Sequence, residues 1–234
     1  MKEMAEILDC STGTVWRLLH RAGIQVRPLG VSKATYNPNL EPSEELAFLI
    51  GAILGDGNVS IYERHVIVKV DSKDDDFAEA IFHSMRCIGL NPFTFKWKNS
   101  NGNLMTRVFV NSVVFGRWLK QLQLSKFDKL FTNEKQRIAF IRGFFDAEGY
   151  VSKKKEWNSY QLDCRIINTN IALLQVVGKL INSLGFQTTI YAEERILPLK
   201  TKYSLYLRGG KKAVTNFINL IHPTISRKLC VVTA

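Results

Sequence analysis

Two acidic residues, Asp56 and Glu148, each stand directly before a glycine at the end of an apolar segment. If each segment is a helix, its last turn carries partial negative charge, and an acid there is unfavourable by about 0.3–1 kcal/mol. Two such helices side by side bring both carboxylates together, where cations are needed. Divalent ions with oxygen ligands meet that need, and paired ions clamp the attacking and leaving oxygens in phosphodiester hydrolysis. An ordinary polar pair at two helix ends is the alternative.

Small residues favour a close pairing of these two helices. Gly51 and Gly55 lie four residues apart in one segment, and Gly143 and Ala147 hold the same places in the other. Residues at this spacing share one helix face, and small side chains there let two helix backbones approach closely. The neighbouring positions are mostly apolar, so we expect a helix pair at the centre of the core.

The two segments belong to a longer internal repeat. Residues 49–57 match residues 141–149 at an offset of 92, and residues 70–74 match residues 166–170 at an offset of 96. The growing offset indicates small loop insertions in the second copy. A looser match pairs residues 108–110 with residues 206–208.

Each copy is about 95 residues long, and the copies join near residues 124–133. We expect the two halves to span residues 43–131 and 132–234. Ser43 is placed to cap the first helix of copy one, and Asn133 with Gln136 resembles a capping box in copy two.

Each copy is expected to contain a helix, a hairpin, an amphipathic helix, a second hairpin and a short helix. The fold class predicted is α+β: a pseudo-two-fold repeat of αββαββα, with two antiparallel sheets forming a saddle around central paired helices. In copy one, after the first helix, we expect a hairpin at 59–62 with 65–70, a helix at 74–88, a hairpin at 93–98 with 105–111 and a helix at 112–122. In copy two, we expect a hairpin at 150–152 with 160–167, a helix at 171–184, a hairpin at 187–193 with 202–208 and a helix at 211–220.

The charge of the chain favours a nucleic-acid partner. Its 234 residues carry a formal net charge of +11, and residues 132–234 supply most of it with 16 basic and 7 acidic side chains. Such an excess is typical of proteins that meet nucleic acid, although solubility alone is another explanation.

Other classes of protein are disfavoured. The four cysteines include no CxxC pair, which argues against a zinc ribbon or finger. The longest apolar run is shorter than the roughly 20 residues of a membrane span, and the first residues have no signal-peptide layout. We expect a soluble, intracellular, cytoplasmic protein with no membrane partner.

The two nine-residue segments resemble the paired motifs of the LAGLIDADG endonucleases. Those motifs have small residues at the third and seventh places, an acid at the eighth and glycine at the ninth. The repeated αββαββα order is also similar to that family, and the resemblance covers about residues 43–220. Residues 136–184 look especially like archaeal single-chain members. The sixth place, an acid in the family name, is Leu54 in copy one; it is not the catalytic place, so activity is still expected.

The resemblance implies a monomeric, magnesium-dependent homing endonuclease that cuts both strands of a long asymmetric DNA site and leaves short 3′ overhangs. By the same resemblance, Asp56 and Glu148 are the catalytic metal ligands, assisted by the backbone near Gly55 and Ala147. Two or three Mg²⁺ ions are expected at the end of the helix pair, with Mn²⁺ or Ca²⁺ able to replace Mg²⁺ in binding.

Family members also place basic or polar residues around the metal site, where they steady water and the developing phosphate charge. Lys73 matches such a lysine in copy one and is implied as a catalytic residue. The alternative for Lys73 is a solvated turn beside Asp74. Thr169 stands at the equivalent place in copy two, so the two sites are expected to be asymmetric, with Lys153 or Arg165 as substitutes.

The hairpins carry alternating polar, basic and aromatic residues, so each sheet has one apolar and one polar face. An ordinary solvated face is the simpler explanation. The resemblance implies that both polar faces lie along the major groove of DNA and contact bases and phosphates. The residues expected to bind DNA there are Lys69, Asp71, Lys96, Lys98, Arg107, Lys153, Lys155, Arg165, Tyr191, Arg195, Tyr206 and Arg208.

Residues 1–27 resemble helix-turn-helix DNA-binding segments, with two short helices around a small polar turn. The apolar residues expected between these helices are Ala5, Ile7, Leu8, Val15, Leu18 and Leu19. The residues expected to contact DNA are Thr12, Thr14, Arg17 and Arg21. A plain amphipathic helix pair is the alternative. Residues 28–42, with several prolines, are expected to form an extended linker.

Two further functions fit the same fold. One is a maturase that binds intron RNA, with or without cleavage. The other is a DNA-binding transcriptional regulator without catalysis, but the presence of both Asp56 and Glu148 favours the nuclease over it. A zinc or HNH nuclease is not supported, because the four histidines form no ligand cluster in the sequence.

Overall fold

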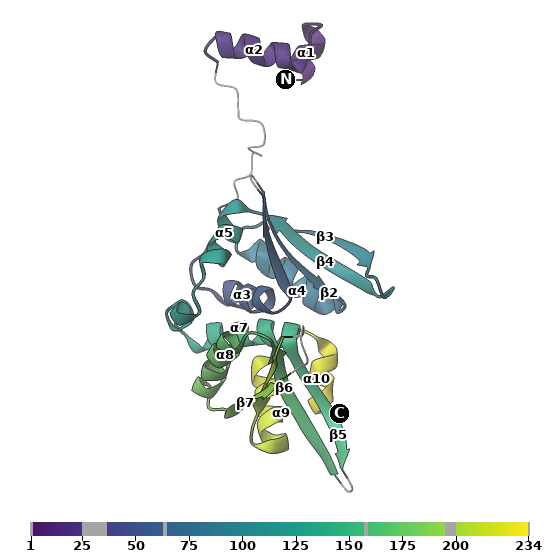
Figure 1. The fold of residues 1–234 in the computed structure, drawn as a ribbon, viewed down its shortest axis with the longest axis vertical. Coiled ribbons are helices and arrows are strands. Elements are labelled where there is room, and N and C mark those ends of the chain that lie inside the picture. Colours follow the sequence, from purple (N-terminus) through teal and green to yellow (C-terminus); the bar gives the residue numbers. More distant parts are fainter. Residues whose placement is uncertain (1, 25–36, 63–64, 157–158, 195–199, 234) are drawn as a thin grey trace. The chain divides into compact units, whose positions relative to one another are not determined.

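The computed structural model describes residues 2–24, 37–62, 65–156, 159–194 and 200–233. The chain divides into two compact units, Met1–Thr35 and Tyr36–Ala234, which are drawn in Figure 1. Each unit is described by itself. The finer division at residues 27, 42 and 131 stays a prediction.

The first unit is a pair of helices, α1 (Lys2–Ile7) and α2 (Thr12–Arg21), so the expected helix pair is present. Ala5 and Val15 are buried as expected. The expectation that the other apolar residues lie inside is wrong for three of them, since each is at least half exposed: Ile7, Leu8 and Leu18. Helices of six and ten residues share only a narrow face, and two small side chains fill it.

The second unit contains the repeat, and both halves follow the order αββαββα. The first half consists of α3 (Glu44–Asp56), β1 (Gly57–Ile61), β2 (Val66–Ser72), α4 (Asp75–Cys87), β3 (Phe93–Lys98), β4 (Leu104–Asn111) and α5 (Val113–Gln121). The second half consists of α7 (Glu134–Glu148), β5 (Gly149–Glu156), β6 (Ser159–Asn168), α8 (Ile171–Ser183), β7 (Thr188–Glu193), β8 (Lys202–Leu207) and α9 (Gly210–Ile221). The predicted α+β class with two antiparallel sheets is confirmed.

Three short elements were not predicted. A 3₁₀ turn, η1 (Leu124–Lys126), and α6 (Phe127–Leu130) connect the halves, and α10 (Ser226–Thr233) follows the second half. These elements lie outside the repeat, so no matching segment revealed them. None of the helices in the described ranges is long and apolar enough to cross a membrane.

Both central helices begin with the expected caps. The Ser43 side chain accepts a hydrogen bond from the backbone N–H of Leu46, at 3.1 Å. Asn133 and Gln136 form a full capping box at the start of α7. These contacts satisfy N–H groups that have no partner within the helix.

The glycines at the ends of the central helices are needed for space. Gly57 and Gly149 have extended backbone, with φ of −83° and −80°, and not the left-handed conformation common after helices. A Cβ atom on Gly57 would meet the carbonyl oxygen of Ile53, and one on Gly149 would meet that of Phe145. The chain therefore turns from helix into strand directly over the last helical turn.

The two sheets have equivalent strand orders, β1-β2-β4-β3 and β5-β6-β8-β7. Gly57 pairs with Val70 in the first sheet, and Gly149 pairs with Ile166 in the second. The offsets of 92 and 96 found in the sequence are thus reproduced by the strand register.

The looser sequence match is wrong by one residue. Val70 pairs with Val108, and its counterpart Ile166 pairs with Leu205. Val108 therefore corresponds to Leu205, and not to Tyr206. Because side chains alternate between the two faces of a strand, a shift of one residue would exchange the faces.

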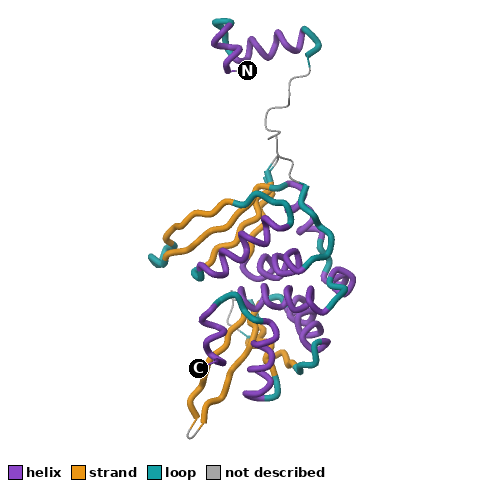
Figure 2. The backbone as a smooth tube through the Cα atoms, turned by 180° about the vertical axis from the view of Figure 1, so that it is seen from behind, coloured by secondary structure: helices purple, strands orange, loops and turns teal. Residues whose placement is uncertain are grey.

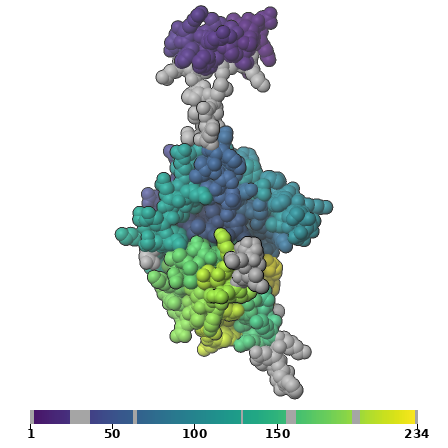
Figure 3. Space-filling model, viewed as in Figure 1, coloured from purple at the N-terminus to yellow at the C-terminus, as the bar shows by residue number. Residues whose placement is uncertain are grey.

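The central helices lie between the sheets. Figure 1 shows α3 and α7 side by side at the middle of the second unit, and Figure 2 shows the same pair from behind. Helices α4 and α5 pack on one face of the first sheet, and α8 and α9 pack on one face of the second. One hydrophobic cluster runs through both halves, which adjoin each other in Figure 3.

Residues 37–42 of the expected linker belong to the second unit and pack within it. The backbone N–H of Asn39 donates to the carbonyl oxygen of Ile88, at 2.8 Å. The side-chain amide of Gln136 donates to the carbonyl oxygen of Pro42, at 2.9 Å. These contacts fix the entry into α3. The rest of the expected linker, residues 28–36, lies outside the described residues.

Candidate functional site

Helices α3 and α7 are in backbone contact at their small residues. A Cβ atom on Gly51 would meet the carbonyl oxygen of Phe140 and lie 2.7 Å from the backbone nitrogen of Phe144. A Cβ atom on Gly143 would meet the carbonyl oxygen of Phe48. Any residue larger than glycine at these two positions would push the helices apart, so the glycines set the helix spacing on which the site depends.

The same packing brings the two acids together. A Cβ atom on Gly55 would touch Ala147 Cβ and lie 3.1 Å from Glu148 Cγ. Asp56 follows Gly55 directly, so the two carboxylates stand at neighbouring helix ends. The predicted convergence of the two acids is present in the fold.

Both carboxyl groups are harder to ionise than usual. Although Asp56 is exposed as a residue, burial of its carboxyl group raises the pKa to about 6. Burial, and after it the charge of Asp56, raises the pKa of Glu148 to about 7. The ammonium group of Lys228 opposes both shifts. Two acids held together in this way favour a bound cation.

Glu148 has a hydrogen-bond partner that the sequence analysis missed. The Asn168 side-chain amide donates to Glu148 Oε1, at 2.6 Å. Asn168 ends β6 at the place that Ser72 holds in the first sheet, and Ser72 instead bonds to the backbone of Asp74. The two acids therefore have different surroundings. The match of residues 166–170 with residues 70–74 was a signal that placed Asn168 near the acids.

Lys228 is a buried cation at the same helix ends. It is only 4% exposed, and its Nζ donates to the carbonyl oxygens of Phe145 and Asp146 at 2.6 and 2.8 Å. Burial lowers the pKa of Lys228 to about 8. Its positive charge thus faces the negative end of α7, within electrostatic reach of Asp56 and Glu148.

Lys73 was expected to be the basic catalytic residue, and Lys228 was not expected at the site. Lys73 is exposed in the turn before α4, and its role stays a prediction. The internal repeat could not predict the position of Lys228, because α10 has no counterpart in the first copy.

The sixth place of the second motif, Asp146, holds the start of α10. Its carboxylate accepts hydrogen bonds from the Thr224 backbone N–H at 2.9 Å and from the Thr224 hydroxyl at 2.6 Å. Asp146 is 3% exposed, and burial raises its pKa. The first copy has Leu54 at this place, and this apolar side chain packs against the hydrophobic core.

The first half also binds α10. Asp76 accepts a hydrogen bond from the backbone N–H of Ser226, at 2.7 Å. Asp74 forms a bidentate ion pair with Arg227, at 2.8 and 2.9 Å. Because α10 contacts both halves, it links them next to the paired acids and delivers Lys228 there.

The first sheet has an open face, defined as the face with Lys69, Asp71, Arg107 and Phe109, which is turned away from its helices. Asp71 and Arg107 are paired across β2 and β4 and form two hydrogen bonds, at 2.6 and 2.8 Å. Burial alone would raise the pKa of Asp71, but the hydrogen bonds and charge of Arg107, with smaller contributions from Trp97 and Lys69, hold that pKa below its usual value. Three residues expected to bind DNA thus share this face: Lys69, Asp71 and Arg107.

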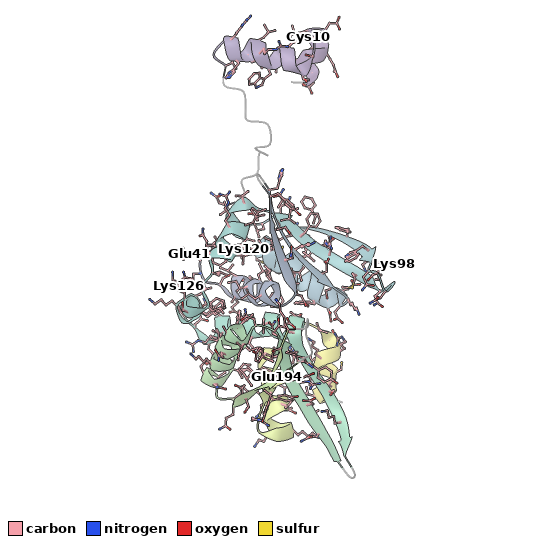
Figure 4. All side chains as sticks on the ribbon, viewed as in Figure 1. Cys10, Glu41, Lys98, Lys120, Lys126 and Glu194 are labelled. Carbon is pink, nitrogen blue, oxygen red and sulfur yellow. The ribbon has the colours of Figure 1, made fainter. Side chains whose placement is uncertain are left out.

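Two other lysines expected on this face lie on the opposite one. Lys96 pairs with Thr106, and both side chains bond to Asp75 at the start of α4, at 2.7 and 2.6 Å. Lys98 lies two residues further, at the outer end of the β3–β4 hairpin (Figure 4). The expectation of a shared face is wrong for Lys96 and Lys98, because side chains alternate along β3.

The open face of the second sheet is defined by Arg165, Tyr206, Tyr191 and Arg208. The Arg165 guanidinium donates to the Tyr206 hydroxyl at 2.9 Å and lies 5.0 Å from the ring centre of Tyr150. Arg208 donates to the Tyr191 hydroxyl. The four residues expected to bind DNA here are therefore neighbours on one face.

The three consecutive lysines of β5 divide between the faces. Lys153 pairs with the buried residue Leu162, on the helix side of the sheet. Lys154 lies on the open face and forms an ion pair with Asp163, at 3.1 Å. The expectation that Lys153 shares the polar face is therefore wrong, and Lys154 lies there instead. The side chains of Lys155 and Arg195 lie outside the described residues.

The remaining candidates, Thr12, Thr14, Arg17 and Arg21, all lie on α2 in the first unit. Arg17 and Arg21 are exposed. Contact of these residues with DNA stays a prediction.

Comparison with known proteins gives the family. The LAGLIDADG-like domain matches residues 135–221, and the WhiA LAGLIDADG-like domain matches residues 45–109. The uncharacterized protein MJ0314 of Methanocaldococcus jannaschii is 32% identical over 185 residues, which are 76% of this chain and 70% of that protein. The chain belongs to the LAGLIDADG family. The two nine-residue segments are the LAGLIDADG motifs of this member.

Solved structures share the LAGLIDADG fold. A variant of the homing endonuclease I-DmoI is 22% identical with a TM-score of 0.55, covering 84% of this chain and 98% of that chain. The N-terminal LAGLIDADG domain of DUF199/WhiA is 16% identical with a TM-score of 0.54, covering 81% and 84%. In sequence, I-DmoI of Desulfurococcus mucosus is 37% identical over 62 residues, 26% of this chain and 28% of that protein.

The donor set at the LAGLIDADG helix ends fits a hard divalent ion. Asp56 and Glu148 offer carboxylate oxygens, and no group of three or more His, Cys, Asp or Glu side chains gathers anywhere in the described ranges. Mg²⁺ is commonly held by one or two carboxylates together with substrate phosphates and water. A pair of acids suits that mode of binding.

Proposed function

We propose that this LAGLIDADG protein is a divalent-metal-dependent endonuclease that hydrolyses phosphodiesters on both strands of a long, asymmetric DNA site and leaves short 3′ overhangs. The observation that carries the proposal is the pair of carboxylates, Asp56 and Glu148, at adjoining ends of the central helices. One chain supplies both acids, so a monomer contains the complete pair.

The acids and their neighbours have separate tasks in this proposal. Asp56 and Glu148 would hold Mg²⁺, with the backbone near Gly55 and Ala147 assisting; when bound, such ions would supply an activated water and electrostatic stabilisation of the leaving oxygen. Asn168 orients the carboxylate of Glu148 by its hydrogen bond. Lys228 offsets the negative charge of the helix end and of both acids.

The open faces and the net charge support duplex DNA as the substrate. Strands β1 and β5 start directly after Asp56 and Glu148, so a duplex at the acids also crosses both sheets. The formal charge of +11 favours a polyanion. I-DmoI has been crystallised in complex with DNA and Ca, and with DNA and Mn, which supports the same substrate and ion class here.

Cleavage selection tests the proposal. Purified protein is incubated with a randomised duplex library and Mg²⁺, with EDTA as the control, and the cut ends are sequenced. We expect cuts at one long site, lost with EDTA. Asp56→Asn and Glu148→Gln should each lower the cleavage rate by at least about a thousandfold, in the range seen when a catalytic group is removed, while binding and folding persist.

A matched control is available on the same helix. Glu134→Gln changes an exposed acid at the start of α7 and should cleave like the unaltered protein. Full cleavage by Glu148→Gln would refute the assignment. Specific retention of DNA without any cutting would indicate a non-catalytic regulator, and preference for intron RNA over every duplex would indicate a maturase.

A further inference from the structure

The two open faces differ at positions that correspond in the repeat. Phe109 pairs with Lys69 in the first sheet, and Tyr206 pairs with Arg165 in the second. Lys69 and Arg165 are related by the same offset of 96 as the rest of β2 and β6, so Phe109 corresponds to Tyr206. By the same register, Phe95 on β3 corresponds to Tyr191 on β7.

In the second sheet, these aromatic residues are polar at the surface. The hydroxyl of Tyr206 accepts from Arg165, and that of Tyr191 accepts from Arg208. The two rings meet edge to face, with centroids 5.6 Å apart. This face therefore presents guanidinium and hydroxyl groups.

In the first sheet, the corresponding residues offer only carbon. Phe109 packs against Phe93 and Phe95, with ring centroids 5.6 and 5.9 Å apart. Phe93 is 54% exposed and Phe95 is 44% exposed. We call these three residues the phenylalanine cluster. Packing of the rings against one another explains their arrangement, but it does not explain why about half of Phe93 and of Phe95 is left in water.

A shallow hollow on the open face adjoins the cluster. It has a volume of about 180 Å³, and its walls include Ile67, Phe95 and Phe109 together with Lys69 and Arg107. Exposed apolar surface with a polar rim is a common feature of binding surfaces, and the rim here is cationic. The occupant that fits is an anionic molecule with an apolar projection.

Duplex DNA has such a projection in its major groove. Thymine carries a methyl group at C5, whereas the other base edges there offer mainly hydrogen-bond donors and acceptors. Strand β1 of this sheet starts next to Asp56, so a duplex positioned for cleavage lies across the cluster. This step rests on the proposed function.

We propose that the phenylalanine cluster recognises thymine methyl groups in the half of the DNA site that the first sheet covers. The tyrosines and arginines of the second sheet read the polar base edges of the other half. The protein thus distinguishes the two ends of its asymmetric site by different chemistry.

Replacement of thymine by uracil tests the proposal, because it removes the methyl group and keeps every hydrogen-bonding group. A randomised duplex library is selected for binding in Ca²⁺, and the selected sites are resynthesised with uracil in one half or the other. We expect thymine to be enriched in one half. Uracil there should weaken binding about fourfold for each methyl group buried, and uracil in the other half should have little effect.

Paired variants connect the effect to the cluster. Phe95→Ala should abolish the difference between thymine and uracil, and its thermal midpoint verifies folding. Tyr191→Ala, at the corresponding position of the second sheet, should retain the difference. Equal sensitivity in both halves, insensitivity in both, or tighter binding of single-stranded RNA than of any duplex would overturn the proposal.

The result separates this proposal from the proposed function. Methyl-sensitive binding without cleavage in Mg²⁺ would uphold the phenylalanine cluster and overturn the endonuclease. Cleavage without methyl sensitivity would uphold the endonuclease and overturn the role of the cluster.

Discussion

The ammonium group of Lys228 donates a hydrogen bond of 2.6 Å to the carbonyl oxygen of Phe145. Phe145 lies in the last turn of α7, three residues before Glu148, and the Lys228 ammonium also lies 5.1 Å from the centre of the Phe145 ring. A residue near the C-terminus of the chain thus caps the helix that carries one of the paired acids. The LAGLIDADG motif and its electrostatic balance therefore depend on α10, which is outside the repeat.

Replacement of this lysine should affect both stability and cleavage. Lys228→Met keeps an unbranched side chain but removes the buried donor to the carbonyl oxygens of Phe145 and Asp146. Phe145 keeps the N–H of Gly149 as a donor, so the expected cost is about 1–3 kcal/mol, mainly from the carbonyl of Asp146. It also removes the charge that lowers the pKa of Asp56 and Glu148, so less of the ionised pair is present near pH 7. Denaturant unfolding and cleavage rates in Mg²⁺ measure the two effects.

An exposed lysine provides the control for this variant. Lys212→Met, in the first turn of α9, changes the net charge by the same amount and should leave both quantities nearly unchanged. If Lys228→Met were as stable and as active as Lys212→Met, the buried ammonium group would have no role in the site.

Without divalent ions, stability should fall as pH rises from about 4 to about 7. Burial raises the pKa of Asp56 to about 6 and that of Glu148 to about 7, from 3.8 and 4.5. The folded state then binds more protons than the unfolded state between these values, so stability is lost as pH rises through the folded pKa values. Free energies of unfolding in EDTA across this range measure the slope.

Two comparisons isolate the paired acids. Glu148→Gln cannot ionise and should show a smaller slope than the unaltered protein. Mg²⁺ should also reduce the slope, because it binds the ionised pair and stabilises the folded state at high pH. A slope unchanged by both would mean that other groups cause the dependence. The lowered pKa values of Asp71, Asp74 and Asp75 place their titration below this range.

Much of the fold was predictable because the sequence repeats. The strand register reproduces the offsets of 92 and 96, and the helix pair follows from small residues such as Gly51 and Gly143. The faces of β3 were predictable too: Lys96 and Lys98 flank Trp97, so alternation alone puts them on the opposite face from that ring.

The environment of the acids was less predictable. Asn168 is near Glu148 by repeat alignment, but its hydrogen bond depends on how β6 meets α7. Lys228 becomes buried only because Asp74, Asp76 and Asp146 hold α10 in place. These hydrogen bonds and ion pairs join segments about 80 to 150 residues apart, and no local pattern in the sequence predicts them.

Removal of the Asp146 carboxylate should loosen α10. Asp146→Asn keeps the shape of the side chain but replaces an oxygen acceptor by an amide donor, next to the N–H and hydroxyl groups of Thr224. We expect a loss of about 1–3 kcal/mol in stability. Hydrogen exchange should become faster in α10, while exchange in α1 and α2 should not change. Cleavage should decrease as well, since α10 carries Lys228.

Asp75, an exposed acid in the first turn of α4, provides the control for Asp146→Asn. Asp75→Asn affects a carboxylate that bonds to Lys96 and Thr106 and does not hold α10. Unchanged exchange in α10 of Asp146→Asn, or equally fast exchange in Asp75→Asn, would show that the Asp146 contact does not fasten the helix.

A methyl group at the centre of the helix pair should be severely destabilising. In Gly51→Ala, the new Cβ atom would meet the carbonyl oxygen of Phe140 and lie 2.7 Å from the nitrogen of Phe144. Backbone atoms cannot rotate away as side chains do, so α3 and α7 must separate, at a cost of more than about 3 kcal/mol.

Gly178→Ala, inside α8, is the matched control: its new Cβ atom would lie 3.1 Å from Leu205 Cδ1, a side-chain atom that can move. The gain in helix propensity, about 1 kcal/mol at most, should leave Gly178→Ala near the stability of the unaltered protein. Denaturant unfolding of both variants measures the difference, and equal stabilities would mean that the central helices are not held at backbone contact. Because the same contact sets the separation of Asp56 and Glu148, any folded fraction of Gly51→Ala should also cleave DNA more slowly than Gly178→Ala.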